Sequence, residues 1–206
     1  MAGTDFLPKG ILNRAAAGAL LAFLLGGGVS CDLFETRKPN DPGGIRFPCA
    51  TLDFPSNVFT NIVQAYGRGD GIPCYVSNLS DVLLLFDFDD VDSLDSPPQF
   101  QSWTKNIEQR VAQNIASGAD SFFLQFKVPY TSVVSQPDVQ TRRYTYEIRF
   151  KGTAITDTLF QGLAEITIRK NLGGQWLVES WVDRPDPAGT TPRTWGYLRG
   201  QYRIGF

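Results

Sequence analysis

The spacing of apolar residues predicts helices in the first half of the chain. Apolar residues recur every three or four positions over residues 55–67 and again over residues 96–118. This spacing places them on one face of each helix. Ser56 or Asn57 can cap the first helix, and Ser96 can cap the second, longer one. The longer helix would turn these side chains toward the core: Phe100, Trp103, Ile107, Val111 and Ile115.

A period of two replaces the helical spacing in the second half. After a short helical turn at about 72–79, an apolar run over residues 82–88 predicts a first strand. Four alternating strands follow, with polar residues toward solvent and apolar residues toward the core. Residues 132–141 and 171–174 would be turns, and residues 194–204 an aromatic tail packed on the sheet. The predicted inward residues are Phe122, Leu124, Phe126 and Val128, then Tyr144, Tyr146, Ile148 and Phe150, then Ala164, Ile166 and Ile168, and finally Trp176, Val178, Ser180 and Val182.

These elements predict an α+β domain in which a curved antiparallel sheet packs against helices. The expected order is two N-terminal helices, one strand, a long helix and then an antiparallel meander. Gly162 lies inside an alternating run. A glycine in such a place often marks a bulge or a bend, and we expect one there.

The first 30 residues have the pattern of a signal peptide. Lys9 and Arg14 are followed by an apolar run over residues 15–28. That run is too short for a bilayer core, which needs roughly 20 residues, but it suits the hydrophobic region of a leader. Its three consecutive glycines are unfavourable inside a buried helix, each costing on the order of 1 kcal/mol. We therefore expect residues 1–30 to be removed from the mature protein.

Cys31 stands at the position of a lipidated cysteine. Residues 28–30 resemble the lipobox of bacterial lipoproteins, although that motif prefers Leu where this chain has Gly28. An ordinary signal peptidase would also accept these small residues and would leave Cys31 free. We expect lipidation of Cys31, a flexible tether over residues 31–50 and a folded domain over residues 51–206. The lipid would anchor the domain to a membrane of the bacterial cell envelope, inner or outer, with the domain in the periplasm or outside.

Composition excludes several classes of function. The chain carries 19 basic and 21 acidic residues without long charge blocks, so no nucleic-acid-binding surface is predicted. It contains no histidine, which excludes Ser-His-Asp and Cys-His catalysis and histidine metal sites. Catalysis would have to use carboxylates, tyrosine, lysine or cysteine. The sequence therefore favours a non-catalytic domain, and it predicts no cofactor.

Two local features allow more than one interpretation. Cys49 and Cys74 could form a disulfide in an oxidising compartment, or they could remain as separate buried thiols. An acidic cluster after the first strand offers oxygen atoms to Ca²⁺. It lacks the glycine and the distal glutamate of an EF-hand, so a solvated loop is the simpler interpretation and no metal site is predicted. The members of this cluster are Asp87, Asp89, Asp90 and Asp92.

The element order and four short stretches resemble the NTF2-like (cystatin-like) domain of uncharacterised bacterial lipoproteins. The stretches are residues 31–37, 63–66, 176–183 and 194–200, and the resemblance covers about residues 57–202. It implies a curved sheet around a conical cavity. Members of the superfamily range from isomerase-like enzymes to binding and interaction domains. No stretch here matches the catalytic motif of an enzyme family, so no catalytic residue is carried over.

An open cavity would lie between the long helix and the concave face of the sheet. The inward residues there are apolar or phenolic, which predicts an uncharged, mainly apolar ligand oriented by Tyr144 and Tyr146. The same tyrosines could instead complete a filled core. We expect an anchored binding domain for a small apolar ligand or an envelope protein; the alternative is an NTF2-like isomerase, lyase or hydrolase that uses carboxylate and tyrosine residues. The predicted pocket residues are Trp103, Phe122, Phe126, Tyr144 and Tyr146.

Overall fold

The computed structural model describes residues 48–67, 69–95, 100–127, 129–152, 155, 158–191 and 193–203. The predicted leader, the lipidation site Cys31 and most of the tether lie outside these residues. Within them, no helix combines the length and the apolar character needed to cross a bilayer.

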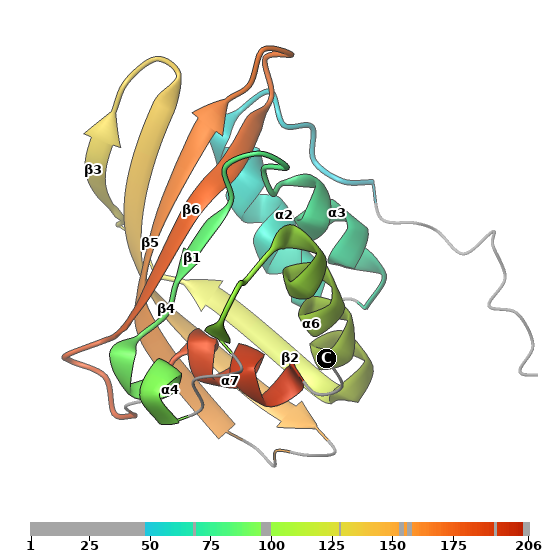
Figure 1. The fold of residues 1–206 in the computed structure, drawn as a ribbon, viewed down its shortest axis with the longest axis vertical. Helices are drawn as coiled ribbons and strands as arrows, with labels where there is room; N and C mark the ends of the chain where they lie inside the picture. The colour runs from blue at the N-terminus through green and yellow to red at the C-terminus, as the bar shows by residue number, and fades with distance from the viewer. Residues whose placement is uncertain are drawn as a thin grey trace, which may run out of the picture. The chain divides into compact units, whose positions relative to one another are not determined.

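Three helices pack on one face of a curved sheet (Figure 1): α2 (Pro55–Gly67), α3 (Ile72–Ser77) and α6 (Lys105–Gly118). Helices α2 and α3 match the segments predicted at residues 55–67 and about 72–79. The apolar stripe of α2 is buried, because its spacing of three and four residues keeps one face on the core. Two further helices, α4 (Asp90–Asp95) and α7 (Trp195–Tyr202), contact each other at one end of the sheet.

The long helix begins later than the sequence predicts. Thr104 is its N-cap, and the Thr104 hydroxyl accepts a hydrogen bond from the Ile107 backbone amide at 3.3 Å. Ser102 has a positive φ of 53°, which a helix cannot contain, so the prediction of one helix from residue 96 onward is wrong. Trp103 is therefore held by a bend rather than by a helix. The predicted cap Ser96 lies outside the described residues.

The strands form a single sheet in the described part of the chain. Its order is β1-β6-β5-β4-β2, and β3 pairs with the same edge of β4 as β2 does. β4, β5 and β6 make the predicted antiparallel meander, whereas β1 runs parallel to β6 at the far edge. The strand bounds are β1 (Leu85–Asp87), β2 (Ala119–Phe126), β3 (Thr131–Ser135), β4 (Val139–Gly152), β5 (Thr158–Lys170) and β6 (Trp176–Pro185).

A β-bulge in β6 changes which side chains face the core. Two consecutive residues of β5 pair with Ser180 and then with Val178, so Glu179 is the extra residue. A bulge shifts the alternation by one position. Trp181 and Asp183 are consequently buried, and the predicted inward positions of Ser180 and Val182 are wrong.

Other differences concern the lengths and types of elements. The first strand covers only β1, and Val82 and Leu83 before it are exposed. The predicted turn at residues 132–141 contains most of β3 and the start of β4. The predicted aromatic tail is the helix α7, which Thr194 caps through a 3.0 Å hydrogen bond from the Gly196 amide. This cap compensates for two glycines inside a short helix.

A disulfide and two hydrogen bonds attach the N-terminal segment of the described domain to α3 and α2. Cys49 and Cys74 are joined by a disulfide with a Cα–Cα distance of 5.2 Å. Asn61 of α2 holds Ala50 through two hydrogen bonds, at 2.8 and 3.0 Å. The disulfide closes a loop with a sequence separation of 25. A loop of this size stabilises a fold by about 3 kcal/mol.

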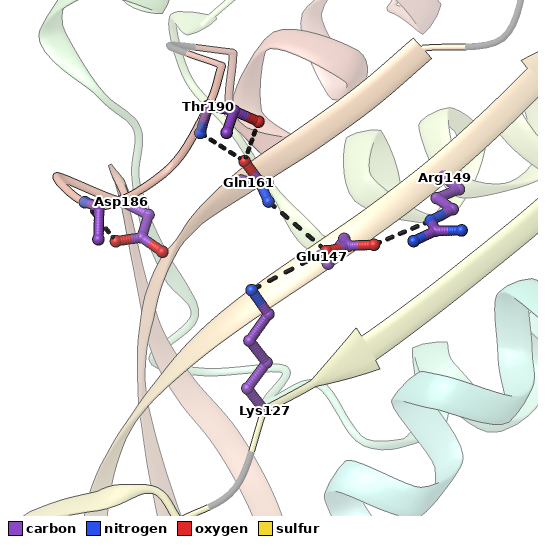
Figure 2. Close-up of polar contacts among 7 residues, drawn as sticks. Lys127, Glu147, Arg149, Gln161, Asp186 and Thr190 are labelled. Carbon is purple, nitrogen blue, oxygen red and sulfur yellow. Dashed lines mark hydrogen bonds and ion pairs between the residues drawn. The ribbon is translucent and has the colours of Figure 1, made fainter.

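The outer face of the sheet carries a network of polar side chains (Figure 2). Glu147 of β4 lies between Lys127 and Arg149, and it accepts a 3.5 Å hydrogen bond from Gln161 of β5. The Gln161 side-chain oxygen in turn accepts from the backbone amide and the hydroxyl of Thr190, at 2.8 and 3.0 Å. Gln161 therefore fixes the loop between β6 and α7. That loop positions the residues of α7 that reach the interior.

Candidate functional site

A buried ion pair lies where α3, α6 and α7 meet. Arg199 donates from Nε to Glu108 Oε1 at 3.0 Å, and both side chains are completely buried. Glu108 Oε1 also accepts from the Tyr75 hydroxyl at 2.5 Å, and Oε2 accepts from the Trp103 indole at 2.7 Å. Each carboxylate oxygen thus has a protein partner. We name Tyr75, Trp103, Glu108 and Arg199 the Glu108 cluster.

Aromatic rings surround the guanidinium of Arg199. Its central carbon lies 4.5 Å from the ring centre of Trp181 and 4.4 Å from that of Trp195. Such cation–π contacts favour the charge in a site without water. Burial lowers the pKa of Arg199, but Glu108 and neighbouring phenols raise it more, so the net pKa lies above the ordinary value. The Arg199 guanidinium therefore keeps its charge in the folded domain.

A second polar group is centred on Asp183 of β6. Asp183 Oδ1 accepts from the Tyr146 hydroxyl at 2.7 Å, and Oδ2 accepts from the Gly196 amide at 2.6 Å. The Tyr146 hydroxyl also accepts from the Trp195 amide at 2.7 Å. Burial raises the pKa of Asp183 and that of Tyr146. We name Tyr146, Asp183, Trp195 and Gly196 the Asp183 cluster; it joins the sheet to the N-terminus of α7.

The position of Tyr146 depends on a glycine in the neighbouring strand. Gly162 pairs directly with Tyr146, and a Cβ at Gly162 would collide with the Tyr146 phenol. The prediction at Gly162 was a bulge or a bend. No shift of register occurs there, so the bulge is absent. The glycine instead leaves the space through which the phenol reaches Asp183.

The acidic cluster considered for Ca²⁺ is divided among separate interactions. Asp87 forms an ion pair with Arg184 at 2.6 Å. Asp92 accepts from the Thr194 hydroxyl at 2.5 Å, and burial raises the pKa of Asp92 to about 6. Asp89 caps α4 through the Val91 amide at 3.0 Å. No group of three or more metal-ligating side chains occurs in the part of the chain that the structure describes.

An open groove of about 610 Å³ lies between α2 and β2. Tyr144 of β4 forms its floor, with ring centres 4.9 Å from Phe59, 5.0 Å from Phe126 and 5.2 Å from Tyr130. Arg142 covers one side, with its guanidinium 5.1 Å from the Phe59 ring and 4.7 Å from the Tyr130 ring. We name these five residues the aromatic groove. The groove offers ring faces, one cation and two phenols.

The predicted pocket residues fall into two groups. Tyr144 and Phe126 line the aromatic groove. Tyr146 and Trp103 belong to the buried clusters instead, and Phe122 stacks on Tyr66 with ring centres 4.7 Å apart. The aromatic groove therefore borders α2, whereas the prediction placed the cavity next to the long helix.

Sequence reasoning missed the residues that make the interior polar. Strict alternation from Trp176 predicts that the Asp183 side chain points to solvent, but the bulge at Glu179 turns it toward the core. Glu108 and Arg199 are 91 residues apart, so their pairing depends on the tertiary fold. A signal did exist, since Arg199 lies in a stretch rich in aromatic residues, where a charge needs a partner. Phe59, Tyr130 and Arg142 of the groove were also not predicted.

Comparisons with known proteins show the fold of the domain. No protein-family model matches the chain, and no curated protein is similar to it in sequence. Solved structures are similar at low identity. A candidate scytalone dehydratase from Novosphingobium aromaticivorans has a TM-score of 0.52 at 8% identity, covering 68% of this chain and 88% of its own.

Two further structures show the same likeness. A candidate aromatic ring hydroxylase from Novosphingobium aromaticivorans has a TM-score of 0.50 at 9% identity, covering 62% of this chain and 83% of its own. A variant of a protein of unknown function from Mycobacterium tuberculosis has a TM-score of 0.50 at 12% identity, covering 72% of this chain and 83% of its own. Identities this low carry information on the fold alone. Together with the sheet order and the helices on its concave face, they show that this chain contains an α+β domain of the NTF2-like fold.

Proposed function

We propose that this protein is a membrane-anchored binding protein of the bacterial cell envelope, whose domain holds a small, mainly apolar ligand in the aromatic groove. One observation supports this function above the others. The carboxylates in the interior are enclosed and bonded to protein groups, whereas the open groove between α2 and β2 is lined by aromatic rings. Apolar hollows with a few polar groups are the usual form of small-ligand sites.

An enzyme would need a different arrangement of the interior. General acid or base catalysis requires a group within hydrogen-bond reach of the substrate. Both oxygens of Glu108 and both oxygens of Asp183 accept hydrogen bonds from the protein. A substrate would have to displace these buried bonds before it met a carboxylate. This favours binding over the isomerase, lyase or hydrolase alternative.

The groove itself indicates the chemistry of the ligand. Phe59, Phe126 and Tyr144 present ring faces and edges that suit a flat aromatic or unsaturated skeleton. Arg142 lies 3.5 Å from the Tyr144 hydroxyl, so the two can together direct a hydrogen-bond acceptor at one end of the ligand. The rest of the ligand would be apolar.

The ligand-binding part of the proposal can be tested with a neutral probe. N-phenyl-1-naphthylamine, titrated into the full chain, should become fluorescent with saturation and should raise the melting temperature. Phe126→Ala should weaken binding at least about tenfold, because it removes a ring of the site. Val91→Ser, an exposed change outside the groove, is the control and should bind as the wild type does. Equal affinity of Phe126→Ala and wild type would exclude the groove as the site.

A thermal-shift screen of lipids, sterols and aromatic metabolites would then identify the class of ligand. Compounds with one acceptor group should lose part of their effect in Arg142→Gln, because that change removes the cation. If no compound stabilises the wild type and the probe does not bind, the filled-core interpretation holds for the whole domain.

The anchor rests on the leader and on Cys31, and its test is separate. Radiolabelled palmitate should be incorporated into wild type and not into Cys31→Ala, and only wild type should partition into the detergent phase. Acyl chains contribute about 0.8 kcal/mol for each buried CH₂, so the difference in partitioning should be large. If both proteins stay unlabelled and in the aqueous phase, Cys31 is not a lipidation site.

A further inference from the structure

We propose that one end of the domain, formed by the β5–β6 hairpin and the loop before β1, lies against the lipid surface of the membrane. Val82 and Leu83 are 85% and 58% exposed, and Leu172 at the tip of the hairpin is fully exposed. These three side chains border one open hollow of about 660 Å³. We name them the hairpin-end patch. Contiguous exposed apolar residues of this kind mark contact surfaces.

The fold does not require apolar residues at these positions. The hairpin turn is held by its polar residues and glycine: the Gln175 amide donates to the Asn171 side chain at 2.9 Å, and Gly174 has a positive φ of 82°. The loop before β1 is held by the Ser80 hydroxyl, which accepts from two backbone amides at 3.3 Å. A polar side chain at position 172 would fit the same turn, because turn residues are usually polar. The apolar character of the hairpin-end patch therefore points to a function outside the fold.

The segment that follows the proposed tether runs next to the start of β6, close to this patch. The Leu52 carbonyl accepts from the Trp176 amide at 2.8 Å, and Trp176 is the first residue of β6 after the hairpin. The proposed tether itself ends at α3 and α2, where Cys49 and Ala50 are held, and the segment that follows it passes the hairpin end at Leu52. Residues 32–47 could extend at most about 55 Å. The opposite end of β6 lies near α4, since β1 pairs with β6 and leads toward α4 (Figure 1).

The charges around the patch fit a lipid surface. Lys105 is paired with Asp81 at 2.8 Å, and Arg169 is paired with Glu179 at 2.8 Å, so the rim is nearly neutral. Lys170 adds one exposed cation. Apart from Lys170, these charged groups are paired with one another and offer a partner protein few directed contacts, whereas a bilayer needs only shallow apolar side chains. The anchor keeps the membrane at high effective concentration, so a weak contact is sufficient.

The inference rests on the proposed anchor, and depth-dependent quenching tests the two separately. The full lipidated chain carries an environment-sensitive fluorophore on Leu172→Cys, in phosphatidylcholine and phosphatidylglycerol vesicles with a nitroxide on a fraction of the headgroups. The same label on Val91→Cys, a 60% exposed position in α4, is the matched control. Quenching at position 172 should exceed quenching at position 91 at least about threefold, because only the former reaches the interface.

A second variant checks that the patch itself makes the contact. Val82→Ser combined with Leu83→Ser should reduce quenching at position 172 at least about twofold, because less apolar surface enters the lipid. Val133→Ser in β3, another exposed apolar position, should leave it unchanged. All these positions are exposed, so melting temperatures should stay close to that of the wild type.

Two results would overturn the inference. If mass spectrometry shows lipid on Cys31 and quenching is equal at positions 172 and 91, the anchor holds and the membrane contact is wrong. If Cys31 carries no lipid, the labelled chain is held on nickel-chelating lipids through an N-terminal hexahistidine. Stronger quenching at position 172 would then still support the contact, and equal quenching would overturn it.

Discussion

Tyr144 and Tyr146 are consecutive inward residues of the same strand, yet their surroundings differ. Tyr146 is completely buried, and its hydroxyl is bonded to Asp183 and to the Trp195 amide. Tyr144 lies on the floor of the aromatic groove, and its hydroxyl accepts a long hydrogen bond from Arg142, at 3.5 Å. A shift of two residues along β4 thus separates an enclosed phenol from one that lines an open groove.

The comparison shows how this domain divides its concave face. At the α7 end, the Arg199 and Trp195 side chains of the helix pack against the concave face of the sheet and fill the interior. At the other end, α2 covers the sheet only in part, and the groove remains open. Buried polar groups must be satisfied inside the protein, and the carboxylates at the α7 end are. Some interior donors do lack a hydrogen-bond partner, among them the Trp181 and Trp195 indoles and one Arg199 nitrogen, but they are buried. The polar groups that border an open hollow are those of the groove.

The largest effect is expected at the Glu108 cluster. Glu108→Ala would leave the Arg199 charge buried without its ion-pair partner and would lower the free energy of unfolding by about 3–5 kcal/mol. Urea unfolding of the full chain measures this change. The double variant Glu108→Met, Arg199→Met should recover most of the loss, because it removes both charges. A loss below about 1 kcal/mol in the single variant would show that Glu108 does not balance Arg199.

The two tyrosines give the sharpest test of the comparison. Tyr146→Phe should lower the free energy of unfolding by about 1–3 kcal/mol, because Asp183 and the Trp195 amide lose a buried partner. Tyr144→Phe should change it by no more than about 0.5 kcal/mol, because the long bond from Arg142 lies at the open groove. Thermal and urea unfolding of both variants measure the difference. Similar losses would contradict the division into a closed interior and an open groove.

The free energy of unfolding should depend on pH because two buried carboxyl groups near α7 have raised pKa values. Burial raises the pKa of Asp92 to about 6, above the ordinary value near 4. The folded domain keeps this proton at pH values where the unfolded chain has lost it. The resulting stabilisation is full below about pH 4 and is lost as the pH rises to about 6. Asp183 has the same sign, because burial raises its pKa as well.

Asp92→Asn isolates this effect, since asparagine cannot ionise. The unfolding free energy of the variant should fall less between pH 4 and pH 7 than that of the wild type. The variant lacks the Asp92 carboxyl, whose pKa of about 6 in the folded domain lies above the ordinary value near 4. Unfolding curves at several pH values measure the slope. An equal slope in both proteins would mean that Asp92 titrates normally in the folded state.

The smallest effect is expected on the outer face of the sheet. Arg143 and Glu165 form an ion pair at 2.5 Å, but both side chains are substantially exposed. Exposed pairs contribute about 0–1 kcal/mol, and salt weakens them further. Glu165→Gln should therefore stay within about 1 kcal/mol of the wild type in urea unfolding. A loss as large as that of Glu108→Ala would remove the contrast between the outer face and the interior.

Local sequence patterns predicted the helices and strands of this fold better than the contacts between residues distant in sequence. The spacing of apolar residues located α2, and alternation located the long strands β4 and β5. These signals are local, because each depends on one face of one element. The start of α6 was missed because Ser102 adopts a positive φ that the sequence pattern does not reveal.

The candidate site was predicted only in part. Tyr144 and Phe126 were identified from alternation alone, and both line the groove. Arg142 was assigned to no face, because its contacts with Phe59 and Tyr130 depend on elements distant in sequence. Asp183 could not be placed, because the bulge that turns it inward is a property of the pairing between β5 and β6.

Hydrogen–deuterium exchange with bound N-phenyl-1-naphthylamine tests the central claim most directly. The claim is that the aromatic groove takes the ligand and the interior does not. The probe should slow exchange in residues 56–64 of α2 and in residues 123–126 of β2, and it should leave residues 181–183 and 195–199 unchanged. Slower exchange confined to the latter two segments would place the ligand in the interior and contradict the account.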